Sequence, residues 1–97
     1  MSMPYKLEFL PSALKEWNKL GATIQQQLKK KLRERLETPR VVSASLHGMP
    51  DHYKIKLRQL GYRLGYSVND DTVTVLVVAV GKRERGDVYN TARSRTQ

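Results

Sequence analysis

The chain contains no cysteine and only two histidines among its 97 residues. The absence of cysteine excludes disulfide bonds, zinc sites built on thiolates and catalysis by a cysteine nucleophile. No apolar run approaches the roughly 18 residues that a membrane-spanning helix needs. The N-terminus, MSMPYKLEFLPS, also lacks the basic, apolar and small-residue regions of a secretory signal. We therefore expect a soluble, cytoplasmic protein without a membrane partner.

Common motifs of nucleotide-binding proteins and hydrolases are also missing. The sequence has no G-x-x-x-x-G-K-[ST], G-x-G-x-x-G, H-E-x-x-H or G-x-S-x-G. Carboxylates do not cluster, because Asp70 and Asp71 are typical of a turn and Glu84 lies among arginines. The histidines, His47 and His52, fall in or beside a predicted loop, where a surface role is the ordinary interpretation. We therefore expect neither a metal nor a cofactor, and no paired-carboxylate chemistry.

Acidic residues are scarce relative to basic ones. The chain has 18 Lys and Arg against 9 Asp and Glu, a net charge of +9 and a pI near 10.1. Such a field attracts nucleic acid, an anionic membrane surface or an acidic protein, and the charge alone does not choose among them. The length predicts one globular domain over residues 1–97.

The first half of the chain predicts a short strand followed by two antiparallel helices. The strand spans residues 5–9, and the helices span 12–20 and 23–38. Ser12 can cap the first helix, and Thr23 can open a capping box at the second. Apolar residues recur every four positions in the second helix and predict one buried face, which consists of Ile24, Leu28, Leu32 and Leu36.

The opposite face of the second predicted helix carries a run of cations. These residues are Lys29, Lys30, Lys31, Arg33 and Arg35. A solvated helix face is the ordinary interpretation of such a run, and binding of a polyanion is the alternative. Lys29, Lys30 and Arg33 are the candidates for contacts with RNA or a ribosome.

Three further strands are predicted over residues 53–58, 62–68 and 72–80. Turns at Leu60-Gly61 and Asn69-Asp70-Asp71 join them. The third strand is apolar at nearly every position, which is typical of a central strand covered on both faces.

The remaining segments complete a predicted α+β fold. Gly81 is expected to end the third of these strands and to leave the basic residues 82–85 in a loop, after which Asp87 can cap a short C-terminal helix. Residues 41–49 allow no assignment. The two N-terminal helices are expected to pack on a twisted, mainly antiparallel sheet of about four strands.

The hairpin HYKIKLRQLGYRLGY, residues 52–66, alternates cations with apolar side chains. Successive side chains of a strand point to opposite faces, so Lys54, Lys56 and Arg58 share one face. Arg63 joins this face from the second strand. The apolar side chains of both strands share the other face, which predicts a core side and a cationic side.

A turn at Leu60-Gly61 predicts the register of this hairpin. The predicted pairs are Leu57 with Leu64, Ile55 with Tyr66, Arg58 with Arg63, Lys56 with Gly65 and Lys54 with Ser67. Like charges that face each other across two strands are destabilising, so we expect an anion against this face. Gly65 supports the same expectation, because glycine inside a strand often marks the close approach of a ligand or another backbone. An ordinary wet cationic face is the alternative.

This cluster of cations, with Arg83 and Tyr89 beyond it, suits phosphoryl transfer on RNA. There the 2′-hydroxyl is the nucleophile, and the protein must orient it and neutralise charge on the phosphate and the departing 5′-oxygen. The identity of the base stays open. Neighbouring cations would lower the pKa of Lys54 or Lys56, and Tyr89 could act as a base or stack on one of the bases of the RNA.

Several segments resemble the RelE toxins of bacterial toxin–antitoxin pairs. These are ALKEWNKLG, QLKKKL, LETPR, LHGMPDHYKIKLRQLGYRLGY and VGKRERGDVY, in this order from about Ala13 to Tyr89. The resemblance implies a RelE-like fold and an endoribonuclease that cleaves messenger RNA in the ribosomal A site. It also implies a 2′,3′-cyclic phosphate and a 5′-hydroxyl as the new ends, formed without a metal.

The functional positions of that family fall on Lys54, Lys56, Arg63, Arg83 and Tyr89. The resemblance implies that Arg83 stabilises the transition state and that Arg63 and Lys54 offset charge at the phosphate and the leaving group. It implies that Tyr89 engages the nucleotide. The choice of the base among Lys54, Lys56 and Tyr89 remains open.

The resemblance also implies two partners: a RelB-like antitoxin that wraps the toxin and covers its basic face, and a ribosome with messenger RNA in its A site. Supporting RNA or ribosome contacts are expected at Arg58, Lys82 and Arg85. Two alternatives remain, a ParE-like toxin that acts on DNA gyrase and a non-catalytic RNA- or ribosome-binding module. The first would not need the five functional residues.

The sequence departs from the family pattern in two places. Gly65 stands where a larger residue is expected, which would widen the cleft or weaken the strand. The tail NTARSRTQ lacks the apolar residues of a firmly packed last helix. The tail therefore predicts weak docking of the C-terminal helix.

Overall fold

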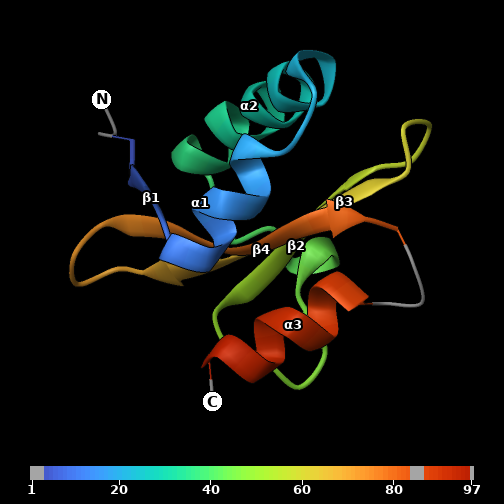
Figure 1. Ribbon diagram of the computed structural model, residues 1–97. Helices are drawn as coiled ribbons and strands as arrows, with labels where there is room; N and C mark the ends of the chain where they lie inside the picture. Colours follow the sequence, from blue (N-terminus) through green and yellow to red (C-terminus); the bar gives the residue numbers. More distant parts are fainter. Residues whose placement is uncertain (1–3, 84–86, 97) are drawn as a thin grey trace.

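The computed structural model describes residues 4–83 and 87–96 as two helical layers on either side of a sheet. In Figure 1, α1 and α2 cover one face of the sheet and α3 lies against the other. The elements in chain order are β1 (Lys6–Phe9), α1 (Pro11–Asn18), α2 (Ala22–Glu37), a single 3-10 turn (Val42–Ala44), β2 (His52–Leu57), β3 (Tyr62–Asn69), β4 (Thr74–Lys82) and α3 (Asp87–Thr96). None of these helices has the length and apolar character needed to span a membrane. The predicted α+β class is confirmed.

The sheet has the strand order β1-β4-β3-β2. β4 pairs in parallel with β1 and antiparallel with β3, and β3 is antiparallel to β2. β4 is therefore a central strand, as its apolar composition predicts. Val75 and Val77 pack in the core beneath α1 and α2, whereas Val78 and Ala79 pack with α3.

Both N-terminal helices begin differently from the prediction. α1 begins at Pro11, with Leu10 as its N-cap, so Ser12 is not the capping residue. Proline suits the first helical position because it lacks an N–H that would have no partner there and because its φ is already helical. The N-cap of α2 is Gly21, and no side chain caps that helix. The predicted buried stripe is confirmed, since Leu28 and Leu32 are fully buried.

The β2–β3 hairpin has a register two residues away from the predicted one. Lys54 lies opposite Gly65 and Lys56 lies opposite Arg63, and residues 58–61 form the loop. A two-residue turn at Leu60-Gly61 would place Leu60 at positive φ, which is unfavourable for leucine. In the longer loop only Gly61 takes a positive φ, of 73°, and its N–H donates to Leu57 O at 2.8 Å. The predicted Arg58–Arg63 pair is therefore wrong.

A shift of two residues leaves every side chain of the hairpin on its predicted face. Tyr53, Ile55 and Leu57 are buried toward α1 and α2, as expected. The like-charge pair across the strands is Lys56 with Arg63, and Arg58 lies in the loop. The division into a core face and a cationic face is confirmed.

β4 also departs from its predicted limits. It begins at Thr74 and continues through Gly81 to Lys82, so Gly81 does not end the strand. Gly81 pairs with Arg63, which extends the sheet beside the cationic face. The β3–β4 register is interrupted by a bulge at Val78. The residues on either side of it, Val77 and Ala79, pair with successive residues of β3.

α3 docks on the sheet, contrary to the weak docking that its polar tail predicted. Val88 and Ala92 are buried against Val78, Ala79, Leu46 and Met49. A Cβ placed on Gly65 would lie 3.6 Å from the Cβ of Ala92, so the small residue at 65 lies directly beneath the helix. The element that approaches Gly65 is thus α3 and not a ligand. Small side chains here achieve the packing that large apolar ones were expected to provide.

A polar cluster holds the C-terminal end of α3. Arg95 donates to both carboxylate oxygens of Glu16 in α1, at 2.9 and 3.2 Å, and to Val78 O at 2.8 Å. Glu16 also accepts from the N–H of Val80 at 3.3 Å. Through these bonds the helix is tied to α1 and to β4 together.

Arg95→Met is expected to loosen α3 because it leaves Glu16 and Val78 O without their shared donor. We expect a loss of about 1 kcal/mol in the free energy of undocking the helix, since the pair is only partly buried. Faster amide hydrogen exchange in α3 would report it. Arg93→Met is the matched control, because exposed Arg93 makes a single side-chain bond within the described part of the chain, to His47 O at 3.3 Å. Equal exchange in both variants would contradict the role of Arg95.

Candidate active site

The structure brings the five predicted functional residues to one face of the sheet. Lys54 and Lys56 extend from β2, Arg63 extends from β3, Arg83 follows β4, and Tyr89 lies in the first turns of α3. Strand alternation on β2 and β3 turns these cations away from the apolar core. Their grouping therefore follows from the same pattern that buries Ile55 and Leu64.

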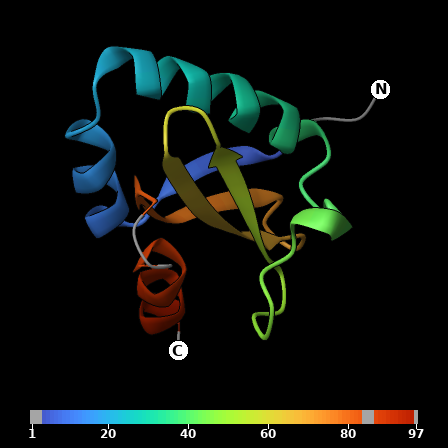
Figure 2. The same ribbon diagram turned by 90° about the vertical axis from the view of Figure 1, so that its right-hand side faces the viewer.

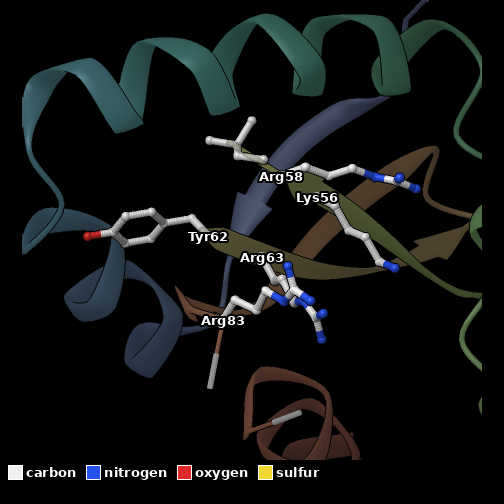
Figure 3. Close-up of a pocket in the computed structure, with 6 residues that line it drawn as sticks. Lys56, Arg58, Tyr62, Arg63 and Arg83 are labelled. Atoms are coloured by element: carbon white, nitrogen blue, oxygen red, sulfur yellow. The ribbon is translucent and has the colours of Figure 1, made fainter. Parts of the chain in front are cut away.

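Three of these cations, Lys56, Arg63 and Arg83, line a hollow of about 210 Å³ together with Arg58. It is lined by Lys56, Leu57, Arg58, Tyr62, Arg63 and Arg83, none of which is acidic. In Figure 3 the side chains of Arg63, Arg83 and Lys56 extend to the same side of the hairpin, whereas Tyr62 turns away. The hollow thus presents several positive groups to one point, an arrangement that suits a phosphate.

Tyr89 packs its ring against the cations. The ring centroid is 6.0 Å from Lys54 Nζ and 5.3 Å from Arg63 Cζ, which is within the range of cation–π attraction. The Tyr89 hydroxyl is buried and has no hydrogen-bond partner among the described residues. Burial raises the pKa of Tyr89, and the nearby Arg63 opposes that rise. A raised pKa favours Tyr89 as a stacking surface over Tyr89 as a base.

Lys56 is a better candidate for the base than Tyr89. The pKa of its ammonium group is lowered from the ordinary 10.5, chiefly by Lys54, then by slight burial and by Arg63, Arg58 and Arg83. Like charges disfavour the protonated form, so neutral amine is more available at Lys56 than at an isolated lysine. The gathering of cations on this face, with Lys54 of the same strand first among them, therefore has a chemical consequence.

Arg35 is a supporting residue, and its predicted place on the exposed cationic face of α2 is wrong. Its side chain reaches inward and donates to Lys54 O at 3.0 Å and to the Tyr66 hydroxyl at 2.9 Å. The Tyr66 hydroxyl donates in turn to Pro39 O at 2.7 Å. Arg35 thereby supports β2 at Lys54. A signal was present, because position 35 follows Leu28 by seven residues and so returns to the buried side of the helix.

The other predicted contacts are more dispersed. Lys29, Lys30 and Arg33 are exposed on α2 and do not line the hollow. Lys82 is exposed at the end of β4, and Arg85 lies outside the described residues. Neither His47 nor His52 lines the hollow, and His52 Nδ1 lies 2.7 Å from Pro50 O.

The chain matches known toxins over most of its length. A family model described as the ParE toxin of type II toxin–antitoxin systems matches residues 7–86. The mRNA interferase toxin RelE of Escherichia coli K12 is 59% identical over 93 residues, which cover 96% of this chain and 98% of that protein.

Solved structures give the same relationship. A free E. coli RelE toxin with two arginine-to-alanine substitutions is 56% identical and has a TM-score of 0.89, over 98% of this chain and 100% of that one. RelE in the intact E. coli RelBE toxin–antitoxin complex is 60% identical and has a TM-score of 0.80, over 84% of this chain and 99% of that one.

Lys54→Met is expected to return the pKa of Lys56 toward its ordinary value, because Lys54 contributes most to the shift. An NMR titration of the Lys56 side chain measures this. Lys6→Met, which removes the same charge from exposed β1, is the control and is expected to change nothing. An unchanged Lys56 pKa in Lys54→Met would contradict the electrostatic account.

The same shift gives the direction of the pH dependence of stability. Because folding lowers the pKa of Lys56, the unfolded chain binds the proton more tightly, and the repulsion destabilises the fold at neutral pH. Stability should recover as the pH rises through the lowered pKa toward 10.5. Lys54→Met should weaken that rise.

Proposed function

Because the chain belongs to the RelE/ParE family of type II toxins, we propose that it is an mRNA interferase, an endoribonuclease that cuts messenger RNA in the ribosomal A site. The convergence of Lys56, Arg63 and Arg83 on one hollow beside Tyr89 carries this proposal. Its RelE relative from E. coli is named an mRNA interferase toxin.

The proposed reaction begins with attack of a ribose 2′-hydroxyl on the adjacent phosphorus. Lys56 takes the proton of the hydroxyl, the 2′-oxygen–phosphorus bond forms, and the bond to the 5′-oxygen of the next nucleotide breaks. The departing 5′-oxygen takes a proton from water and leaves as a hydroxyl. Arg83 and Arg63 offset charge on the phosphate, and Lys54 offsets charge on the departing oxygen. Tyr89 stacks on a base and holds the nucleotide in line. The products are a 2′,3′-cyclic phosphate and a 5′-hydroxyl.

The proposed partners follow from this reaction and from the charge. The ribosome presents the substrate, which places the toxin in the cytoplasm. Exposed cations outside the hollow are proposed to contact RNA or the ribosome: Lys29, Lys30, Arg33 and Lys82. Arg58, which lines the hollow, and Arg85, which lies outside the described residues, are proposed as further contacts. A RelB-like antitoxin is the proposed inhibitor, because a related RelE forms a RelBE toxin–antitoxin complex.

A gyrase-directed toxin of the ParE type is not favoured. Action on gyrase requires no cluster of catalytic cations, yet Lys56, Arg63 and Arg83 are gathered at one hollow, and none of the described residues that line it is a carboxylate. A non-catalytic binding module would spread its affinity over many cations and would lose a little with each one removed.

Arg83→Ala is expected to slow cleavage of a defined mRNA on programmed ribosomes by about a hundredfold to a thousandfold, because it removes a donor to the transition state. Binding to ribosomes should mostly survive. Primer extension maps the cuts, and Arg93→Ala is the control at an exposed arginine outside the site. Cleavage that survives in folded Arg83→Ala would refute the proposed role.

Chelation of divalent ions should leave the chemical step intact, because the proposed groups are all supplied by side chains. Ribosomes need a multivalent cation to stay assembled, so the test compares the cleavage rate in Mg²⁺ with the rate in cobalt hexammine, which supports the ribosome but offers no open coordination site.

The new 3′ ends should be 2′,3′-cyclic phosphates, which acid opens and a 3′-phosphatase alone does not remove. A 3′-hydroxyl product would rule out attack by the 2′-hydroxyl.

Naked RNA should be cut little, because the ribosome supplies the alignment of the 2′-hydroxyl with the phosphate.

A further inference from the structure

A groove adjoins the candidate active site on the side of α2. It has a volume of about 540 Å³ and lies between α2 and the loop of the β2–β3 hairpin. Its lining residues are Thr23, Gln27, Lys31, Lys56, Leu57, Arg58, Gln59 and Leu60. Three of them, Lys56, Leu57 and Arg58, also line the 210 Å³ hollow. The two spaces therefore meet along the end of β2.

The route between the two spaces passes the outer side of β2, which is the edge strand of the sheet. Figure 2 shows the hairpin beneath α2, with α3 well below it. In Figure 3, Arg58 extends from the hairpin under α2, away from the guanidinium groups of Arg63 and Arg83. Arg58 is thus placed at the junction, where it can face a group that leaves the hollow.

The lining of the groove matches single-stranded RNA in its chemistry. Lys31, Lys56 and Arg58 supply positive charge, and none of the lining residues is acidic. Gln27 offers an amide for the edge of a base, and Leu60, which is 44% exposed, offers an apolar surface for its face. Unpaired RNA is recognised by this combination of phosphate contacts, base-edge hydrogen bonds and surfaces for the base rings.

An internal cut requires a strand that continues on both sides of the scissile phosphate. On the α3 side, Tyr89 lies over Lys54 and Arg63, and Ala92 covers Gly65. On the α2 side, the groove continues from the hollow over the end of β2. The groove is thus a cationic path along which the strand can leave the site.

We propose that this groove is a substrate subsite that binds the RNA strand next to the scissile phosphate. Lys31 and Arg58 contact successive backbone phosphates, and Gln27 faces a base. This inference rests on the proposed function and extends it to residues of α2 that the five functional positions do not include. The occupant is RNA and not an acidic antitoxin segment, because the groove shares its lining with the phosphate-sized hollow.

Kinetics on programmed ribosomes give the first test. Lys31→Ala should raise KM for cleavage about threefold to tenfold and leave kcat within about twofold, since a contact that binds substrate and transition state equally affects KM alone. Lys6→Ala removes the same charge from exposed β1 on the opposite edge of the sheet and should change neither constant. Equal effects of the two variants would overturn the proposal, as would a loss confined to kcat.

Photo-crosslinking identifies the occupant directly. A benzophenone amino acid replaces Gln27, which lines the groove, or the adjacent exposed Gln26, which does not. On ribosomes that carry labelled mRNA, the probe at 27 should form an mRNA adduct that the probe at 26 does not form. Adducts only to ribosomal RNA, or only to a co-purified antitoxin, would overturn the subsite.

The two proposals fail in different ways in this experiment. The unmodified chain is assayed for A-site cleavage on the same ribosomes. Cleavage without an mRNA adduct from position 27 would contradict the proposed RNA subsite in the groove and would leave the proposed nuclease activity supported. No cleavage by the folded chain sinks the nuclease, and an mRNA adduct at 27 then still supports the groove as an RNA-binding surface.

Discussion

Mutual repulsion among the cations on one face of the sheet is the constraint on which the site depends. Lys56 and Arg63 lie opposite each other on paired strands, a placement that destabilises a hairpin. The other face of the same strands offsets the repulsion, because Ile55, Leu64 and Tyr66 are almost completely buried beneath the helices. The apolar core thus holds the charges close together in the absence of an anion, and an arriving phosphate meets a site that needs little rearrangement.

Hydrogen bonds at the open end of the hairpin, opposite its loop, support this arrangement. Near the site, Arg35 connects α2 to the backbone of Lys54 and to the buried Tyr66 hydroxyl. Directly before β2, Arg40 bonds Asp51 at 2.8 Å, and it also bonds Asp70 at 2.9 Å. Exposed ion pairs of this kind contribute little stability each. Their role is to fix the start of β2 relative to the β3–β4 loop. The start of the strand in turn sets the positions of the β2 cations in the site.

The sequence correctly predicted which face of the sheet most side chains of the hairpin occupy, but it did not predict the register or the individual side-chain contacts. The reason is physical. Side-chain alternation depends only on a strand being present, so the cationic face followed from residues 53–66. Register depends on loop geometry, and the penalty for Leu60 at positive φ shifted it by two residues. Arg35 was missed because it was grouped with the exposed cations by its charge, although its position, seven residues after Leu28, lies on the buried side of the helix. The docking of α3 depends on the fit between Ala92 and Gly65, which apolar periodicity does not measure.

The same repulsion limits what the site can do without help. The pKa of Lys56 is lowered chiefly by Lys54 and further by Arg63, Arg58 and Arg83. A bound phosphate brings negative charge among these groups and so raises the pKa of Lys56 again. Substrate binding thus works against the base that the proposed reaction uses. Acid–base catalysis alone is then weak, and alignment of the 2′-hydroxyl must supply much of the rate. A site of this kind suits a substrate that the ribosome has already positioned.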